Sequence, residues 1–306
     1  CLVGSEMCIR DRRQTKNIKN RLLFGCRFYR KRIFKYSMNF LFLGDIVGRS
    51  GRDIVLSELP KVKANEEIDF VIVNGENAAG GYGITKKICD ELFSVGVDVI
   101  TSGNHIWDQK ETADFISQEK RLLRPLNFME GTPGSGCEIY PLKNNKKVAV
   151  INIMGNIYMK KADDVFNCIS LKLQSLKLGK DVDFIIVDIH AEITSEKMAM
   201  GHYLDGQVTL VVGTHSHVPT YDFRILNHGT AYQTDAGMCG DYDSVIGMNK
   251  DAALNKFLKQ PNLERLSPAL GKGTLSGIKV IADEKTGLAK DIKPITIGAH
   301  FNQRSF

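Results

Sequence analysis

The stretch "VTLVVGTHSHVPT", residues 208–220, runs from an apolar, β-prone segment directly into a short polar loop. Two histidines, His215 and His217, stand in that loop with one serine between them. A short apolar run that ends in glycine and polar residues is typical of a buried strand in an α/β sheet, and ligands bind such sheets at the carboxyl ends of the strands. The stretch therefore predicts an α/β fold whose chemistry collects where the strands end.

Four more apolar segments of the chain end in the same way. The polar residues that follow them are Asp45 after "FLFLG", Glu76 and Asn77 after "FVIVNG", Asn104 and His105 after "VITSG", and His190 after "FIIVDI". Glycine directly before three of these polar groups lets the backbone turn tightly and approach a ligand. Because parallel strands end at one edge of a sheet, we expect all five loops to converge there.

Segments with helical patterning lie between these strands. The expected helices are residues 51–65, 85–96, 108–119, 162–177 and 194–204. Strands that alternate with helices predict a mostly parallel sheet covered on both faces. Residues 121–146 are expected to be irregular. Antiparallel strands with turns between them are expected at residues 222–226, 230–235, 273–283 and 289–298. We therefore expect one compact α/β domain, residues 38–306, with a second sheet.

The net charge of +6 is unevenly distributed along the chain. Residues 1–37 hold 11 lysines and arginines against 2 acidic residues, whereas the rest of the chain holds 30 basic and 33 acidic residues. A protein that binds nucleic acid through a basic face carries the excess in its folded part. We therefore expect no strong nucleic-acid surface on the folded part, whose mild acidity favours a small substrate over a long polyanion.

Residues 1–37 show no strong periodicity and open with "CLVGSEMCIRDR", which resembles a translated sequencing adapter. The segment is also rich in arginine and poor in acids, as transit peptides are, although serine is scarce. We expect it to be a non-native or disordered leader, a translation artefact in front of Met38. No apolar run of the chain reaches the roughly 20 residues that span a bilayer, so no membrane segment is expected.

The polar residues at the strand ends form a mixed set of nitrogen and oxygen donors without thiolates. Such a set suits iron, manganese or zinc better than calcium, which prefers oxygen ligands. The number of donors fits two cations that share a carboxylate better than one tetrahedral zinc. The cysteines of the folded part, Cys89, Cys137, Cys168 and Cys239, form no C-x-x-C pair, which favours a reducing cytoplasm and excludes a thiolate zinc site.

Each of these residues also has a purely structural interpretation. Asp45 can cap a helix, Asn77 and Asn104 can form turns, and an isolated His190 is more often a core histidine. A His-x-His pair also occurs in amidohydrolase-type barrels, although it usually follows the first strand there. The coincidence of five strand ends favours a metal site. The glycine-rich "GENAAGGYGIT", residues 75–85, lacks the P-loop lysine and the G-x-G-x-x-G pattern, which argues against these modes of nucleotide binding.

The order of the motifs GD, GEN, GNH, a single His and GTHSH resembles the calcineurin-like metallophosphoesterase superfamily, whose blocks are GD, GD, GNH, H and GHxH. Longer stretches resemble the bacterial YmdB-like phosphodiesterases. These stretches are "FLGDIVGRSGRD", "NGENAAGGYGIT", "ITSGNHIWD", "RPLNFMEGTPG", "DIHAEITSEKMAMG", "VVGTHSHVPT" and "TDAGMCGDYDSVIGM". The resemblance extends from Met38 to the C-terminus and leaves out residues 1–37.

The resemblance implies a calcineurin-like four-layer α/β/β/α sandwich with two metals, iron or alternatively manganese, at the carboxyl ends of the strands. The implied ligands are Asp45 and His217 for the first metal, Asn104, His190 and His215 for the second, and Glu76 as the bridge between them. Most of the superfamily has Asp at the bridging position. Asn77 is implied to lie beside the metals, as a ligand or a phosphate contact.

The resemblance also implies an activity. A metal-bridging hydroxide attacks phosphorus in line, and His105 acts as the general acid that protonates the departing ribose oxygen. The expected reaction is hydrolysis of 2′,3′-cyclic nucleotides at the 2′ bond, which leaves 3′-nucleotides. Such substrates arise from RNA breakdown, which favours a cytoplasmic enzyme.

Several alternatives stay open at this point. One is a phosphomonoesterase or nucleotidase on the same fold, and another is a nucleotide-binding regulatory protein with secondary catalysis. The transit-peptide interpretation of the leader would make the chain an organellar enzyme instead. Assembly into a homo-oligomer is also left open by the sequence.

Overall fold

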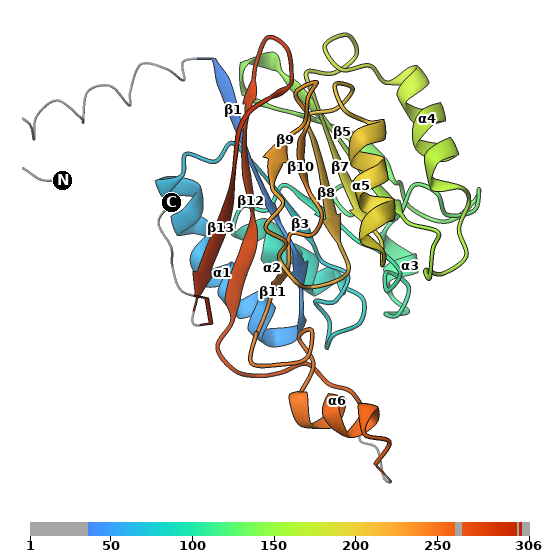
Figure 1. Cartoon of the computed structure of the whole chain (residues 1–306), viewed down its shortest axis with the longest axis vertical. Coiled ribbons are helices and arrows are strands. Elements are labelled where there is room, and N and C mark those ends of the chain that lie inside the picture. Colours follow the sequence, from blue (N-terminus) through green and yellow to red (C-terminus); the bar gives the residue numbers. More distant parts are fainter. Residues whose placement is uncertain (1–35, 261–264, 299, 302–306) are drawn as a thin grey trace, which may run out of the picture. The chain divides into compact units, whose positions relative to one another are not determined.

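The structure, a computed structural model, describes residues 36–260, 265–298, 300 and 301 of the chain. The predicted leader, residues 1–37, lies outside the described residues except for its last two. The described strands form two large sheets and one small two-stranded sheet (Figure 1). Among the described helices, none combines the length and the apolar character that crossing a membrane requires.

The first sheet has five strands in the order β13-β12-β1-β3-β4. These strands are β1 (Ser37–Leu43), β3 (Phe70–Asn74), β4 (Val99–Thr101), β12 (Thr274–Asp283) and β13 (Ala289–Gly298). β1, β3 and β4 are parallel, while β12 runs antiparallel to both β1 and β13. β3 and β4 are buried along their whole length, as strands of a sheet covered on both faces must be.

The second sheet has six strands in the order β5-β6-β7-β8-β10-β9. These strands are β5 (Cys137–Pro141), β6 (Lys147–Met154), β7 (Phe184–His190), β8 (Leu210–Thr214), β9 (Arg224–Ile225) and β10 (Ala231–Gln233). The four inner strands are parallel, and β5 and β9 run antiparallel to their neighbours at the two edges. The largely apolar inner strands again indicate burial on both faces.

The two large sheets pack against each other and are covered by a layer of helices on each outer face, with a hydrophobic core at each of the three interfaces. α1 (Gly48–Asn65) and α2 (Lys86–Ser94) pack on the outer face of the first sheet, and α4 (Val165–Ser175) and α5 (Thr194–Tyr203) on that of the second. Between the sheets, Phe40 of β1 contacts Phe184 of β7 with ring centroids 5.1 Å apart. This arrangement confirms the predicted four-layer α/β/β/α sandwich.

The helix predicted at residues 108–119 is largely absent. Only α3 (Thr112–Phe115) forms there, and the residues before it are turns. Two polar side chains explain the difference, because they bond elsewhere in the protein: Asp108 accepts a hydrogen bond from His105 Nδ1, and Gln109 Nε2 donates to Tyr82 O at 2.6 Å. Polar side chains that find such partners compete with helical backbone bonds.

The antiparallel strands predicted in the C-terminal part form, except that β10 pairs in parallel with β8, and these strands are divided between the two large sheets. β9 and β10 extend the second sheet, where β10 runs parallel to β8, and β12 and β13 extend the first sheet beside β1. β5 also forms inside the section expected to be irregular. β12, β5 and β10 supply hydrogen-bond partners for backbone groups of β1, β6 and β8 that would otherwise be unpaired at a sheet edge.

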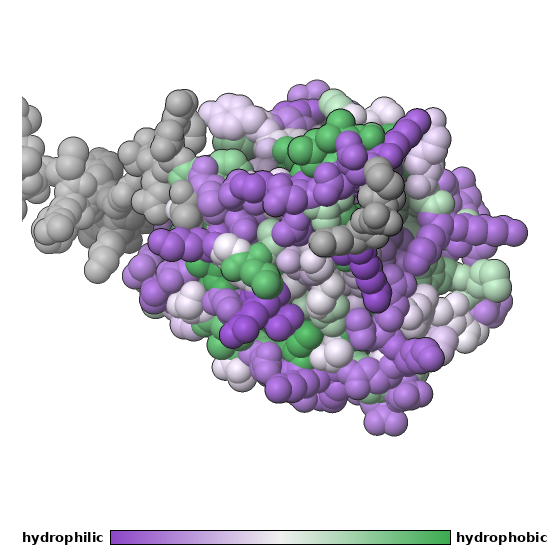
Figure 2. Space-filling model, turned by 90° about the horizontal axis from the view of Figure 1, so that it is seen from below, coloured by the Kyte–Doolittle hydropathy of each residue, from purple (hydrophilic) through white to green (hydrophobic). Residues whose placement is uncertain are grey.

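Four short elements escaped prediction: β2 (Asp45–Ile46), β11 (Met238–Cys239), the 3₁₀ turn Lys143–Asn145 and α6 (Lys250–Phe257). β2 pairs in parallel with β11, with Asp45 opposite Met238, and this pairing anchors the backbone of Asp45. α6 lies at the bottom of Figure 1. Its Leu254 and Phe257 are exposed, but the face seen in Figure 2 is mainly hydrophilic, with hydrophobic residues in small separate patches.

Candidate metal centre

The five predicted loops converge at one edge of the two sheets, as the sequence predicts. β1, β3, β7 and β8 end toward the lower side of Figure 1, and β4 runs parallel to β3. The loops that follow these strands bring the predicted residues together. Several of these polar side chains are buried, with exposed fractions between 0 and 6%, namely Asp45, Glu76, Asn77, His190 and His217. Asn104, His105 and His215 are partly buried.

His190 at the end of β7 is the centre of this cluster. Its Nδ1 lies 2.9 Å from Thr214 Oγ1, and Thr214 donates its own hydroxyl proton to Asp188 Oδ1 at 2.7 Å. Thr214 must therefore accept at its oxygen, so the network assigns a proton to Nδ1 of His190. The other ring nitrogen, Nε2, faces into the cluster.

Three further donor atoms surround His190 Nε2. Glu76 Oε1 and Asn104 Oδ1 each lie 2.9 Å away, and His215 Nδ1 lies 3.1 Å away. His215 directs its Nε2 at Glu192 at 2.9 Å, which leaves Nδ1 of the neutral ring with a lone pair. Four atoms that can each act as a metal ligand thus meet in one buried place, and a single proton on His190 Nε2 can bridge only two of them. A metal cation in place of that proton would contact all four, so these residues fit a metal ion.

Asp45 and His217 form a second pair of donors beside the first group. Asp45 Oδ2 accepts the backbone N–H of His215 at 3.1 Å, whereas Oδ1 is buried and has no hydrogen-bond partner among the described residues. Oδ1 lies 3.8 Å from His217 Nε2, and His217 Nδ1 donates to Ile246 O at 2.8 Å. A buried carboxylate oxygen without a partner is costly. This pair therefore also fits a cation.

Electrostatics within the cluster point the same way. Burial lowers the pKa of His190, but the neighbouring carboxylates, Glu76 foremost, outweigh burial and raise this pKa to about 9. Burial alone raises the pKa of Glu76, but the positive charge of His190 brings it down to about 2. Burial lowers the pKa of His215 to about 3, so that this imidazole is neutral and free to act as a ligand. The Glu76 carboxylate thus keeps its negative charge beside the proton of His190, and a bound metal would replace that proton.

Two predicted residues stand apart from this group of donors. Asn77 donates from Nδ2 to Gly81 O at 3.0 Å, and its buried Oδ1 has no partner among the described residues. His105 donates its backbone N–H to Glu76 Oε2 at 2.9 Å, and its ring Nδ1 lies 2.6 Å from Asp108 Oδ2. Its side chain is 25% exposed, so the ring borders solvent beside the donor cluster.

Sequence reasoning missed the residues that orient this cluster. Asp188 accepts hydrogen bonds from Thr214, from Thr101 Oγ1 at 2.6 Å and from Asn74 Nδ2 at 3.2 Å, all within the buried interior. A signal for Asp188 was present, because it is a charged residue inside an otherwise apolar strand and lies on the same face of β7 as His190, two residues away. Asp108, three residues after His105, was hidden in the predicted helix.

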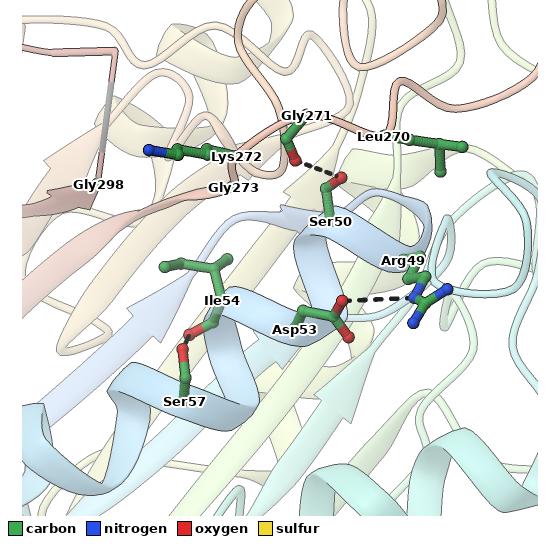
Figure 3. Close-up of a pocket in the computed structure, with 10 residues that line it drawn as sticks. All are labelled: Arg49, Ser50, Asp53, Ile54, Ser57, Leu270, Gly271, Lys272, Gly273 and Gly298. Carbon is green, nitrogen blue, oxygen red and sulfur yellow. Dashed lines mark hydrogen bonds and ion pairs between the residues drawn. The ribbon is translucent and has the colours of Figure 1, made fainter.

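A cavity of about 820 Å³ is lined by none of the predicted site residues (Figure 3). It lies between the first half of α1 and residues 270–273, where Ser50 Oγ donates to Gly271 O at 2.9 Å. Arg49 and Asp53 line it as an exposed ion pair, 3.5 Å apart. The predicted ligand crevice is therefore a different place.

Comparison with known proteins identifies the family of the chain. A family model described as YmdB-like protein matches residues 41–295. The chain belongs to the YmdB-like family. The resemblance inferred from the motifs is thereby confirmed, and with it the assignment of the chain to the metallophosphoesterases, a class of hydrolytic enzymes.

Individual relatives cover most of the chain. The 2′,3′-cyclic-nucleotide 2′-phosphodiesterase of Bacillus subtilis (strain 168) is 47% identical over 263 residues, which are 85% of this chain and 97% of that protein. The crystal structure of a novel phosphatase from Mycoplasma pneumoniae has a TM-score of 0.80 at 35% identity and covers 86% of this chain and 94% of its own. A hypothetical protein from Thermus thermophilus has a TM-score of 0.79 at 37% identity, over 85% and 99% of the two chains.

Proposed function

We propose that this chain is a two-metal phosphodiesterase that hydrolyses 2′,3′-cyclic nucleotides at the 2′ bond and leaves 3′-nucleotides. The observation that carries the proposal is the meeting of unprotonated donor atoms around His190 Nε2, next to the unpartnered oxygen of Asp45. Two adjacent groups of donors suit two cations better than one. The Bacillus subtilis relative, named for this reaction, supports the choice of substrate.

The positions of the donor atoms support a place for each metal ion in this proposal. We place Asp45 and His217 on the first ion, and Asn104, His190 and His215 on the second. Glu76 serves as the bridge, because its Oε1 lies in the cluster while its Oε2 is held by the backbone N–H of His105. Asn77 has its unpartnered Oδ1 available for a metal ion or a phosphate oxygen. Imidazole and carboxylate donors suit iron, or alternatively manganese.

Metal ions held by these residues would lower the pKa of a water molecule and stabilise charge on the phosphoryl oxygens. The residues of the chain supply the proton that the reaction needs. His105 is partly exposed beside the cluster, and Asp108 holds its Nδ1 proton. This leaves Nε2 to donate a proton to the departing 2′ oxygen. General acid catalysis of this kind contributes about 10²–10⁴-fold to the rate.

The substrate that we propose is small, and the cytoplasm is the compartment where such products of RNA breakdown arise. The acidic balance of residues 38–306, with 30 basic and 33 acidic groups beyond residue 37, disfavours a long polyanion. A phosphomonoesterase is the second candidate, because the structural neighbour from Mycoplasma pneumoniae is called a phosphatase. The two candidates differ in whether a phosphodiester or a monoester is turned over.

The test uses the full chain supplied with Fe²⁺ or Mn²⁺. Elemental analysis should find about two transition-metal ions per chain, and 2′,3′-cyclic AMP should be converted to 3′-AMP faster than AMP is dephosphorylated. Faster turnover of AMP would favour the phosphomonoesterase. A chain that stays free of metal and inactive would refute the site itself.

Glu76→Gln is the matching variant. This variant removes the bridging charge, so we expect it to lose hydrolysis and to bind at least one metal ion fewer than the wild type. The control is Glu66→Gln, which removes a carboxylate paired with Lys279 and should leave hydrolysis and metal content unchanged. If Glu76→Gln binds the cyclic nucleotide as tightly as the wild type and keeps the cellular effect of the protein, the regulatory alternative gains support over catalysis.

A further inference from the structure

Lys197 carries a charge in a place where water does not reach. It lies on α5 with an exposed fraction of 0%, and its Nζ is 2.8 Å from Asp235 Oδ2 and 3.0 Å from Ser216 Oγ. Asp235 is equally buried. Burial of two charges costs desolvation free energy, and the attraction between them offsets this cost only when their geometry is good. A buried ion pair of this kind therefore suggests a specific role.

One partner of this ion pair, Ser216, lies on the loop that carries His215 and His217. Asp235 Oδ2 accepts the backbone N–H of Ser216 at 3.1 Å, in addition to the Lys197 ammonium, and Oδ1 accepts the N–H of Gly237 at 2.8 Å. Ser216 is therefore held at both its backbone and its hydroxyl. It is the single residue between His215 and His217.

This loop has an unusual backbone. His215 and His217 have φ angles of +92° and +62°, in the left-handed region that residues other than glycine rarely adopt. Such conformations persist only where the surroundings impose them. Ser216 is clamped between the two histidines. His215 Nδ1 faces His190, whereas His217 Nε2 faces Asp45, so the two rings point at different parts of the cluster.

We infer that Lys197 and Asp235 are positioning residues: through Ser216 they hold the left-handed turn that aims His215 and His217 at two different metal ions. This inference rests on the proposed function, because it presupposes the two ions. The side-chain hydrogen bonds of Lys197 and Asp235 join them to each other, to Ser216 and to Gly237. The clamp thus holds the loop at Ser216, and its loss would let the loop relax and move both imidazoles.

The matched control is Lys279 on β12, far along the chain from the loop. Lys279 is also a mostly buried lysine, 6% exposed, and its Nζ lies 2.9 Å from Glu66 Oε2. Lys197→Met and Lys279→Met thus each remove one buried ammonium group from a carboxylate. Only the first variant acts on the loop that carries His215 and His217.

The measurement is the dissociation constant for Mn²⁺, obtained with the full chain by competition with a chelator, together with the number of ions bound and the melting temperature. We expect Lys197→Met to weaken binding of at least one ion about 10–100-fold, as the loss of a residue that orients a ligand does. Lys279→Met should lower the melting temperature and leave Mn²⁺ affinity within about twofold of the wild type. Equal Mn²⁺ affinity in the two lysine variants would overturn the inference.

Ser216→Ala keeps the experiment decisive if Lys197→Met does not fold. It removes the hydroxyl that Lys197 contacts but keeps the backbone bond to Asp235, so a smaller loss of Mn²⁺ affinity is expected, and wild-type affinity would count against the clamp. The proposed function fails separately: a wild-type chain that binds Mn²⁺ but hydrolyses no phosphodiester would refute the activity and leave the clamp intact.

Discussion

Gly103 lies against the imidazole ring of His190, so closely that a Cβ atom at position 103 would stand 2.2 Å from His190 Cδ2. His190 cannot move aside, because it is fully buried and bonded to Thr214. The glycine of the GNH motif is therefore required by close packing on a proposed metal ligand. A side chain there would push the central imidazole of the cluster out of place.

Gly103→Ala should consequently reduce both metal content and hydrolysis of a phosphodiester by at least about 10-fold, the scale on which displaced ligands affect metal sites. Gly240→Ala is the matched control, because a Cβ atom there meets nothing nearer than 3.5 Å. Elemental analysis and turnover of 2′,3′-cyclic AMP provide the measurement. Full metal content in Gly103→Ala would show that the ring of His190 has more freedom than the structure indicates.

Thr214→Val should weaken metal binding by about 10–100-fold, because it removes the hydroxyl that orients a ligand. Without that hydroxyl, Nδ1 of His190 and the carboxylate of Asp188 both lose a partner in the buried interior. Thr214→Ser keeps the hydroxyl and should restore the affinity. A chelator titration of both variants tests this, and a serine variant as weak as the valine variant would point to packing of the methyl group instead.

Asp108→Asn should slow the hydrolysis of 2′,3′-cyclic AMP by about 10–100-fold, within the range of general acid catalysis. The reason is that the carboxylate that holds the Nδ1 proton of His105 is lost. The loss should be much smaller with bis-p-nitrophenyl phosphate, whose leaving group departs readily without a proton. The measurement is kcat of the variant and of the wild type with each of the two substrates. An equal loss with both would assign Asp108 a role in folding or in metal binding.

The ion pair between Glu66 and Lys279 should make stability depend on pH. The hydrogen bond from Lys279 lowers the pKa of Glu66 below its usual 4.5 in the folded chain. The pair therefore stabilises the fold fully above pH 4.5, and this contribution is lost as the pH falls through the lowered pKa. The gap in melting temperature between the wild type and Lys279→Met should shrink from pH 7 to pH 3. A constant gap would mean that Lys279 acts through packing alone.

Removal of residues 1–37 should leave kcat and KM for the cyclic nucleotide unchanged, since we propose residues 38–306 as the catalytic domain. The family match begins at residue 41, within β1, and all residues of the donor cluster come later in the chain. The steady-state constants of full and shortened chains decide the matter. A shortened chain with altered KM would give the first segment a role in substrate binding.

Most of the fold was readable from the sequence because its signals are local. Apolar runs such as those before Asp45 and His190 indicate buried strands. The polar residues that follow these strands must lie at the edge of the sheet where the parallel strands end. The sheet that receives β10 or β12 was not readable, since strand pairing across long separations leaves little trace in the paired segments themselves. The helix predicted at residues 108–119 is reduced to α3, because Asp108 and Gln109 bond to His105 and Tyr82, which precede the predicted helix.

By itself, then, the sequence determined which residue types stand at the strand ends, and the motif order determined the family. Only the tertiary structure decided how those residues are held: Thr214 and Asp188 set the proton on His190, and the buried pair of Lys197 and Asp235 meets Ser216. Hydrogen bonds and ion pairs between distant segments depend on atoms a few ångströms apart in space. Periodicity along one chain reports which face a residue occupies, but not the partner that it meets there.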